Sequence, residues 1–468
     1  MAAPRGAGVT HNSGATAHWD FRLGCCGYPL NLRNATTGGV SLGAGDQQGV
    51  RGVASYSLAM TTELAPDLAT LLADARSMLP DVVAIRRRIH RHPEIGTDLP
   101  VTQAVIVEEL ERLGLQPVLG RALSSVTALI EGAKPGPTIL LRGDMDALPL
   151  TEDTGLEFAS EIDGAMHACG HDAHVAMLIG AARLLVDRQA ELPGRVLLMF
   201  QPGEEGYGGA NDMLDEGLLD IPTGRTHGPV EAAFAIHIGT RYPTGAIRLR
   251  GGAQMASSDV LRITVEGKGG HASAPHLAVD PITVAAEIVL ALQVAVTRGV
   301  DPFDPAVITI AKVTAGTTNN IIPETAELLG TIRTVSEETR AAVKERVKAL
   351  VEGICSAYGA TGRLDIEAGY PVTANDDAFA AFVLDVARDL VGREAVEPLK
   401  APIMGAEDFS YVLQKVPGAM AFLGAVPAGI DPETVPQNHS NLVIFDEEAL
   451  PVGVALYAAV ALRHLGGA

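Results

Sequence analysis

The chain has 468 residues, of which 47% are hydrophobic and 51 are glycine, and its formal net charge is −21. This length exceeds one ordinary core, and the composition fits a globular α/β protein rather than a disordered or fibrous one. The acidic balance argues against nucleic acid or a membrane as the main partner. The 4 cysteines are too few for a disulfide framework, which indicates a reducing, cytoplasmic compartment.

Residues 1–59 are rich in Gly, Ala, Ser and Asn without sustained periodicity, so we predict a poorly ordered extension. They lack a basic region followed by an apolar stretch, so a secretory signal is not expected. More regular sequence begins at Met60, which suggests the hypothesis that translation starts there. The apolar stretch 449–462 is short for a membrane span and contains Pro451, so we expect a core helix.

Predicted helices and strands alternate in the next part of the chain, and each polar cluster comes just after a strand. The helices are predicted over 68–89, 102–113, 174–186 and 209–216, and the strands over 125–130, 138–141, 195–200 and 232–236. This alternation predicts an α/β fold with a central, mostly parallel sheet flanked by helices. Open sheets of this kind place their ligands at the carboxyl ends of the strands.

The pattern changes at Gly251-Gly252. Strand, helix, strand, strand, helix and strand are then predicted over 259–265, 281–297, 306–313, 326–334, 337–357 and 363–367. This βαββαβ order is typical of a small ferredoxin-like α+β domain. We therefore expect a lid domain of residues 256–368, inserted into one catalytic, metal-binding domain that residues 60–255 and 369–468 form together.

Two short motifs carry groups that suit metal chemistry. Cys169 and His171 lie in a turn before a predicted helix, whose positive end helps to keep the thiol deprotonated. Glu204 and Glu205 follow a predicted strand and point in different directions, so one can bind a metal while the other acts as general base on water. The alternatives are a buried cysteine beside a solvated histidine, and a solvated acidic turn.

His237, directly after an apolar strand, and His439, near the C-terminus, are weak candidates by themselves, because a lone histidine is more often a structural group. Asp144 and Asp146 close another strand, where carboxylates that orient imidazoles are expected. The potential ligands are a strong set when taken together: Cys169, His171, Glu205, His237 and His439. Two further histidines are left outside this set: His167 and His174.

The predicted lid domain has a polar cluster of its own, made of His271 within Gly269–Ser273, Asn320 before a strand, and Arg333 on that strand. The glycines allow close approach of the backbone. Arg333 could form a salt bridge at the rim of the site, and this role is as well supported by the sequence as a contact with substrate.

With these motifs, the sequence resembles the dinuclear-metal aminoacylase and carboxypeptidase superfamily. It is most similar to the amidohydrolase branch, which includes N-acyl-amino-acid amidohydrolases, hippurate hydrolases and auxin-conjugate hydrolases. The resemblance runs from about Ile85 to Leu450 and rests on these ordered motifs: Arg87–His90 with Pro93-Glu94, Arg142–Pro149, Met166–His174, Gln201–Glu205, Gly269–Ser273, Asn320–Glu324, Gly405–Phe409 and Asn438–Ser440.

The resemblance implies two divalent metal ions, with zinc, manganese, cobalt and nickel as candidates. Cys169 would be shared between them, and the other ligands would be His171, Glu205, His237 and His439. Glu204 would be the general base, and Asp146 would orient the ligands from behind. Gly203 stands where many relatives have Ala, which should be harmless. Asn441 stands where Pro is common, and this can alter the loop that presents His439.

The resemblance also implies how substrate is bound. His271 would stabilise the oxyanion in the site of a partner subunit, and Asn320 and Arg333 would hold the substrate carboxylate. A homodimer formed through the lid domain is expected. Residues 1–59 have no counterpart in the family pattern.

The expected reaction is hydrolysis of the amide bond of an N-acyl amino acid, such as an acetyl or benzoyl derivative, to a carboxylate and a free amino acid. A peptidase, or a deacetylase of an N-acetyl diamino acid, would share the same ligands and remains an alternative. A non-catalytic metal- or ligand-binding protein is a weaker alternative, because every matching position is filled.

Overall fold

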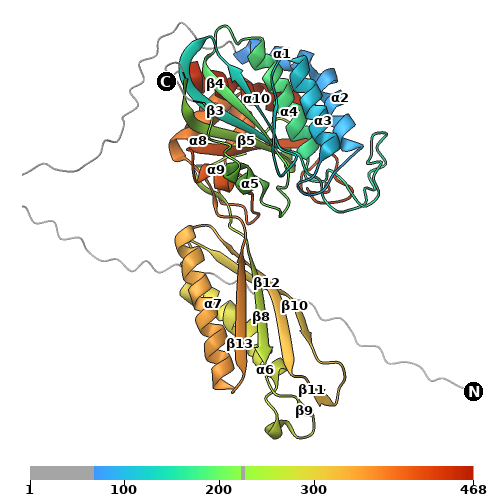
Figure 1. Cartoon of the computed structure of the whole chain (residues 1–468), viewed down its shortest axis with the longest axis vertical. Helices are drawn as coiled ribbons and strands as arrows, with labels where there is room; N and C mark the ends of the chain where they lie inside the picture. The colour runs from blue at the N-terminus through green and yellow to red at the C-terminus, as the bar shows by residue number, and fades with distance from the viewer. Residues whose placement is uncertain (1–67, 223–226, 467–468) are drawn as a thin grey trace, which may run out of the picture. The chain divides into compact units, whose positions relative to one another are not determined.

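The computed structural model describes residues 68–222 and 227–466. The predicted extension over residues 1–59 lies outside this part. The two main sheets have eight and four strands, and both are flanked by helices (Figure 1). This arrangement confirms the predicted α/β fold with a separate antiparallel region.

The helix predicted over 68–89 is wrong in one respect, because the structure has two helices there. These are α1 (Leu68–Ser77) and α2 (Leu79–His90), and α2 begins with a proline in its first turn, Pro80. Proline has no N–H to continue the hydrogen bonding of α1, but it fits the first turn of a new helix. The next helix, α3 (Pro100–Arg112), also begins with proline.

The eight-stranded sheet has the order β1-β2-β4-β3-β5-β16-β6-β15. Its strands are β1 (Val118–Leu119), β2 (Val126–Glu131), β3 (Lys134–Asp144), β4 (Pro193–Gln201), β5 (His227–Pro243), β6 (Ile247–Leu249), β15 (Val396–Pro398) and β16 (Gly418–Val426). The central strands β4, β3, β5 and β16 are parallel. Their carboxyl ends therefore lie along one edge, which collects the residues that follow β3 and β4.

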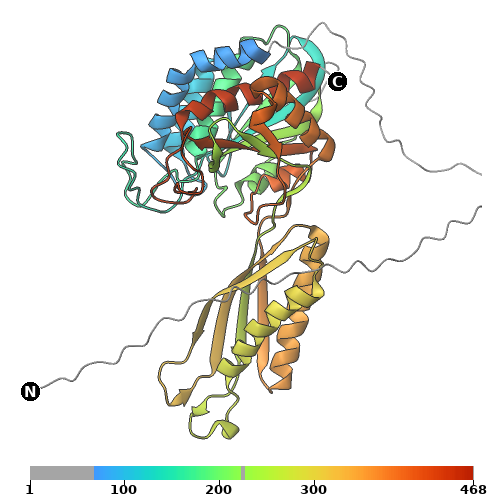
Figure 2. The ribbon, with the colours of Figure 1, turned by 180° about the vertical axis from the view of Figure 1, so that it is seen from behind.

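Helices cover both faces of this sheet (Figures 1 and 2). One face packs against α1, α2, α4 (His171–Val186), α8 (Asp377–Val391) and α10 (Leu450–Gly466). The other face packs against α5 (Gly209–Asp215) and α9 (Ser410–Leu413). In β3, Ile139 and Leu141 belong to the first core and Leu140 to the second. A strand buried on both faces is typical of a parallel sheet covered by helices.

A second, antiparallel sheet has the order β10-β12-β8-β13. Its elements follow the predicted βαββαβ order: β8 (Asp259–Glu266), α6 (Pro281–Gly299), β10 (Ala306–Ala315), β12 (Thr325–Thr334), α7 (Glu337–Ala357) and β13 (Thr361–Ala368). Leu261, Ile263 and Val265 of β8 pack with α6 and α7 in a core of their own. A short pair, β9 (Gly270–His271) with β11 (Ile321–Ile322), is added to this four-stranded unit. The predicted boundaries of the lid domain, residues 256–368, and its role as a lid stay predictions.

The chain enters and leaves the four-stranded unit through two adjacent segments, 256–258 and 369–372, which we refer to as the hinge. Ser258 N donates to Tyr370 O at 2.9 Å, and Tyr370 N donates to Ser258 Oγ at 3.2 Å. Just outside the hinge, β7 (Gly252–Met255) pairs with β14 (Thr373–Asn375). The two crossings are therefore joined to each other by backbone hydrogen bonds.

Two helical segments are long and apolar enough to cross a membrane by length and composition alone, Pro281–Gly299 and Glu447–Gly466. The second is 78% buried in its most apolar window, and it contains α10, the core helix expected from the sequence. The first is α6, which buries one face in the four-stranded unit and exposes Leu290 and Val294 on another.

Candidate metal centre

Cys169 lies in the turn before α4, and His171 is the first residue of that helix. Gly170 between them has a φ of 88°, in the left-handed region that glycine adopts without strain. A β-carbon at this position would also collide with the side chain of Ile238. The turn therefore requires glycine, and it brings the thiol and the imidazole close to each other.

The predicted ligand atoms form two groups that share the sulfur of Cys169. One group adds His171 and His237, and the other adds Glu205 and His439; within each group all ligand atoms lie within 4.8 Å of one another. The Cys169 Sγ atom is 3.4 Å from His237 Nε2 and 3.3 Å from His439 Nε2. The structure thus brings all five predicted ligands together around one thiol.

Backbone carbonyls fix which ring nitrogen of two histidines faces this cluster. Nδ1 of His171 donates to Asp146 O at 2.8 Å, and Nδ1 of His237 donates to Ile238 O at 2.7 Å. Because a carbonyl only accepts, a proton lies on Nδ1 of each ring, and Nε2 faces the cluster, where the neutral ring would offer a lone pair to a cation. The Nε2 atom of His171 and the Oε1 atom of Glu205 are buried without a hydrogen-bond partner. A cation would satisfy both atoms, and the set of thiol, imidazole and carboxylate donors fits divalent transition-metal ions.

The structure corrects the predicted place of His237, which lies inside β5 and does not follow it. β5 continues to Pro243 because its second half pairs with β16, with His237 opposite Phe422. Burial and the imidazole of His174 lower the pKa of His237 to about 3, so the ring stays neutral, the state that binds metal. His174 itself uses both ring nitrogens, with Asp144 and with the N–H of Ile238.

His439 has a φ of 69° and is the only non-glycine residue with positive φ in the described part of the chain. Its N–H donates to Ala168 O at 2.9 Å. The neighbouring Asn438 donates from Nδ2 to the carbonyls of Cys169 and Ile238, both at 3.1 Å. A non-glycine residue in the left-handed region is strained, and such strain is found most often at functional sites, where surrounding hydrogen bonds hold the residue in place.

The two adjacent carboxylates, Glu204 and Glu205, are positioned by Asp146. Asp146 Oδ1 accepts from Glu204 N at 2.9 Å, and Asp146 Oδ2 accepts from Glu205 N at 3.0 Å. Its own backbone carbonyl is the acceptor for His171. Asp146 therefore contacts two candidate ligands and the candidate base, the position that the resemblance implied for it.

The environments of the two carboxyl groups shift their pKa values in opposite directions. Burial and the charges of Glu407 and Glu205 raise the pKa of Glu204 well above its ordinary range. Burial acts to raise the pKa of Glu205 too, but the imidazoles of His439 and His171 outweigh it and lower that pKa. Such a pair suits a proton acceptor next to an ionised metal ligand.

The ionisation of the Cys169 thiol, at the centre of the cluster, also depends on nearby cations. Burial and the Glu205 carboxylate raise the pKa of Cys169 above its ordinary value. The Cys169 sulfur and the Glu205 carboxylate in turn raise the pKa of His439 to about 10. A buried thiolate is stable only with positive charge beside it, and metal ions are the strongest source of such charge.

A buried ion network lies beneath the cluster. Of its members, only Asp144 was expected near the site, and Arg142, Glu407 and Asp408 were not. Arg142 at the end of β3 pairs with Asp144 (2.7 Å), Glu407 (2.8 Å) and Asp408 (3.2 Å). Burial acts against its charge, but these carboxylates raise the pKa of Arg142 further above its usual range. Asp144 Oδ2 lies 3.4 Å from His171 Nε2, so the network reaches the ligands. The sequence signal for this network was the presence of charged residues, Arg142 and Asp144, at the end of the apolar strand β3.

A cavity of about 530 Å³ opens beside the cluster and is lined by the ligands Cys169, Glu205, His237 and His439, by Glu204, by Arg333 and by the apolar side chains Tyr242, Met255, Ile403 and Phe422. The guanidinium of Arg333 forms no hydrogen bond or ion pair with any residue in 68–222 or 227–466. Burial lowers the pKa of Arg333, and the charge of Asp259 acts against this shift. Its guanidinium is therefore available to an anionic ligand of the cavity.

His271 and Asn320 do not lie at this cavity. They come together on the β9–β11 pair, where His271 is opposite Ile321 and Ala272 N donates to Asn320 O at 3.1 Å. Both residues are exposed. Ser273 N donates to Nδ1 of His271 at 3.1 Å, which leaves the proton on Nε2, free to donate outward.

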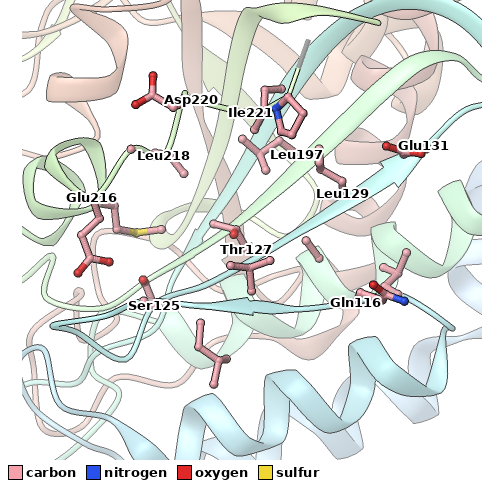
Figure 3. Close-up of a pocket in the computed structure, with 18 of the residues that line it drawn as sticks. Gln116, Ser125, Thr127, Leu129, Glu131, Leu197, Glu216, Leu218, Asp220 and Ile221 are labelled. Carbon is pink, nitrogen blue, oxygen red and sulfur yellow. The ribbon is translucent and has the colours of Figure 1, made fainter. Parts of the chain in front are cut away.

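A larger cavity, of about 800 Å³, lies elsewhere in the eight-stranded region (Figure 3). Gln116, Thr127, Leu129 and Glu216 are among its lining residues, and no predicted site residue contributes to it. The smaller cavity is thus the one that combines concave shape with convergent chemical groups.

The sequence profile of peptidase family M20/M25/M40 matches residues 140–463. The chain belongs to this family. The M20 family assignment confirms the resemblance inferred from the motifs, and it makes the protein a metal-dependent hydrolase.

Two relatives and one solved structure illustrate the range of the M20 family. Thermostable carboxypeptidase 1 of Saccharolobus solfataricus is 40% identical over 394 residues, which cover 83% of this chain and 97% of that one. IAA-amino acid hydrolase ILR1-like 2 of Arabidopsis thaliana is 38% identical over 391 residues, 82% and 85% of the two chains. The structure of the Bacillus subtilis YXEP protein, a dinuclear metal binding peptidase of the M20 family, aligns with a TM-score of 0.71 at 34% identity and covers 84% of this chain and 100% of that one.

Proposed function

We propose that the protein hydrolyses the amide bond of N-acyl amino acids, giving a carboxylate and a free amino acid. The observation that carries this proposal is the pair of ligand groups that share the Cys169 thiol, next to Glu204 and a cavity with a free guanidinium. A relative that acts on IAA-amino acids supports the same substrate class.

The ligands proposed for two divalent ions are Cys169, His171, Glu205, His237 and His439. When bound, the ions would polarise the scissile carbonyl and lower the pKa of water. Zinc suits thiolate and imidazole best, and manganese, cobalt and nickel are alternatives. The low cysteine content and the free thiol of Cys169 fit a reducing compartment, so we place the protein in the cytoplasm.

Glu204 is proposed as the group that accepts a proton from water and then returns it to the leaving amine. Burial and the neighbouring carboxylates raise the pKa of Glu204, which strengthens it as a proton acceptor. Asp146 accepts a hydrogen bond from the backbone N–H of Glu204 and so keeps the Glu204 backbone in place. His271 is proposed to donate from Nε2 to the oxyanion, an interaction of about 3–4 kcal/mol in comparable enzymes.

The substrate carboxylate is assigned to Arg333 and Asn320. A planar guanidinium grips a carboxylate with two parallel hydrogen bonds, which selects substrates with a free carboxyl group near the scissile amide. The apolar wall of Met255, Ile403 and Phe422 is suited to the acyl group.

Because His271 and Asn320 lie away from the cavity of their own chain, we propose a homodimer in which each chain supplies them to its partner's site. The four-stranded unit offers a surface for this contact. Among the described residues, its edge strand β10 pairs on one side only, and Val307 of β10 and Leu290 and Val294 of α6 are exposed. Residues 256–368 would then form the lid and dimerisation domain.

The decisive experiment is a panel of N-acetyl, N-benzoyl and indole-acyl amino acids and of dipeptides, assayed with each metal after chelator treatment. We expect acyl amino acids with a free carboxyl group to be cleaved, and their amides to be poor substrates. Preference for dipeptides would favour the peptidase alternative, which the similarity to a carboxypeptidase supports. No cleavage with any metal would reject the proposal.

A further inference from the structure

The hydroxyl group of Tyr370 reaches from the hinge to the loop that carries Glu204 and Glu205. It donates to Glu204 O at 2.6 Å and accepts from Gly206 N at 2.8 Å and from Gly208 N at 3.2 Å. A phenol has one donor and two acceptor positions, so all its hydrogen-bonding capacity is spent on this one loop.

The loop needs such support because glycine dominates it. Gly203, Gly206 and Gly208 all have positive φ, at 74°, 93° and 76°. Glycine adopts this conformation readily but also leaves it readily, so the loop has little stiffness of its own. Asp146 holds two of its N–H groups from the sheet, and Tyr370 holds the other side.

Tyr370 is itself fixed by the hinge. Its backbone forms both hydrogen bonds with Ser258 described above, and the guanidinium of Arg340 on α7 donates to the preceding carbonyl, Gly369 O, at 3.0 Å. Its ring packs edge-on against Tyr411, with 6.2 Å between the centroids. The tyrosine therefore connects the four-stranded unit to the catalytic loop.

We propose that Tyr370 is a positioning residue, which sets the place of Glu204 from the hinge; this inference rests on the reaction proposed above. Without the hydroxyl, Glu204 O and the N–H groups of Gly206 and Gly208 lose this partner, and the loop moves about its glycines. Glu205 keeps its hydrogen bond to Asp146, so metal binding is retained. Arg333 is untouched, so substrate affinity is retained. The loss falls on turnover.

The test compares Tyr370→Phe with Tyr411→Phe. The two variants remove a hydroxyl from the same corner, but that of Tyr411 only reaches Gly369 O at 3.4 Å and does not touch the loop. Metal content, melting temperature, kcat, KM and amide hydrogen exchange of the peptide that covers residues 203–208 are measured for both. For Tyr370→Phe we expect exchange about tenfold faster in that peptide, kcat lower by about 10–100-fold, KM within about threefold and full metal content. Tyr411→Phe should match the wild type.

Unchanged exchange in Tyr370→Phe would overturn the proposal, whatever the activity. Faster exchange with unchanged kcat, or equal effects of the two variants, would also overturn it. If the wild type cleaves nothing in the panel, the proposed function fails, and the exchange data still decide whether Tyr370 holds the loop.

Ser258→Ala provides a second variant, which weakens the anchor of Tyr370 and keeps its hydroxyl. We expect a smaller loss of kcat, and no further loss when it is combined with Tyr370→Phe, because both act through the same hydroxyl. Additive losses would contradict the role of the hinge.

Discussion

The Nε2 atom of His439 lies 3.3 Å from the sulfur of Cys169, although the two residues are 270 positions apart in the chain. The contact joins a late loop to the turn before α4. Because His237 approaches the same sulfur from the sheet, the thiol is the point at which three distant segments meet.

Replacement of Cys169 by alanine should empty at least one metal site, because the thiol belongs to both ligand groups. Elemental analysis after dialysis is the measurement. Cys355→Ala is the control, since Cys355 is also a buried free cysteine but belongs to the core of the four-stranded unit. Full metal content in Cys169→Ala would show that the sulfur is no ligand.

His439→Gly and His439→Ala should both weaken metal binding, but they should differ in stability. Alanine in the left-handed region costs about 1 kcal/mol or more, and glycine does not have this cost. Thermal unfolding after chelator treatment should therefore give a higher melting temperature for the glycine variant. The opposite order would mean that the loop relaxes when the imidazole is removed.

Glu204→Gln should keep both metals and lose turnover by about 10²–10⁴-fold, because glutamine has the same shape but cannot accept a proton. Steady-state kinetics with parallel metal analysis tests this. Glu367→Gln, on the exposed surface of β13, controls for the loss of one negative charge. Substantial turnover in Glu204→Gln would remove Glu204 from the role of base.

Arg333→Ala should mainly raise KM for substrates with a free carboxyl group, by about 10-fold or more, because one charge-assisted contact is lost. Substrates with a carboxamide in its place should show little change. Arg363→Ala serves as the control, since Arg363 is an exposed arginine of β13 that pairs with Glu266. If KM does not change, the carboxylate is anchored by another residue.

His90 should make stability depend on pH. Burial acts to lower its pKa, but the charge of Asp172 and the hydrogen bonds with Asp172 and Glu152 raise the pKa of His90 to about 9, from an ordinary value of 6.5. Charged His90 therefore contributes its full stabilisation, roughly 3 kcal/mol, below pH 6.5, and this is lost as the pH rises to about 9.

Denaturant unfolding of the wild type and His90→Gln between pH 5.5 and 9.5 measures this effect. The difference in unfolding free energy should be largest at low pH and should shrink toward about pH 9. His92→Gln, which replaces a partly exposed histidine of the same region, serves as the control. A difference that grows with pH would contradict the assignment.

Much of the fold could be predicted because local patterns decide it. The helix over residues 337–357 has the predicted bounds, and the strands of the four-stranded unit agree within a few residues. The shared edge of the parallel strands explains why Asp146, after β3, meets Glu205, after β4. His237 lies within β5 and His439 in a late loop, so strand ends alone do not place them. The break between α1 and α2 was missed, although Pro80 was a readable signal.

Tertiary relationships explain what the sequence could not show. His237 lies within β5 because β16, far along the chain, extends the pairing. Two of the three ion-pair partners of Arg142 are Glu407 and Asp408, far along the chain, and no periodicity connects them with Arg142. The role of Tyr370 depends on hydrogen bonds to a loop 166 positions away. A single tyrosine in a connecting segment has no local signature.

The position of β16 between β5 and β6 has a consequence for synthesis of the protein. This strand follows the whole four-stranded unit in the chain, so β5 has one unpaired edge until residues 418–426 leave the ribosome. The four-stranded unit is continuous in sequence and can fold earlier. A growing polypeptide of this kind exposes the apolar edge of β5 from the synthesis of β5 until that of β16, and such edges associate with other chains. Chaperone demand should therefore be greatest while the segment between β5 and β16 is being synthesised.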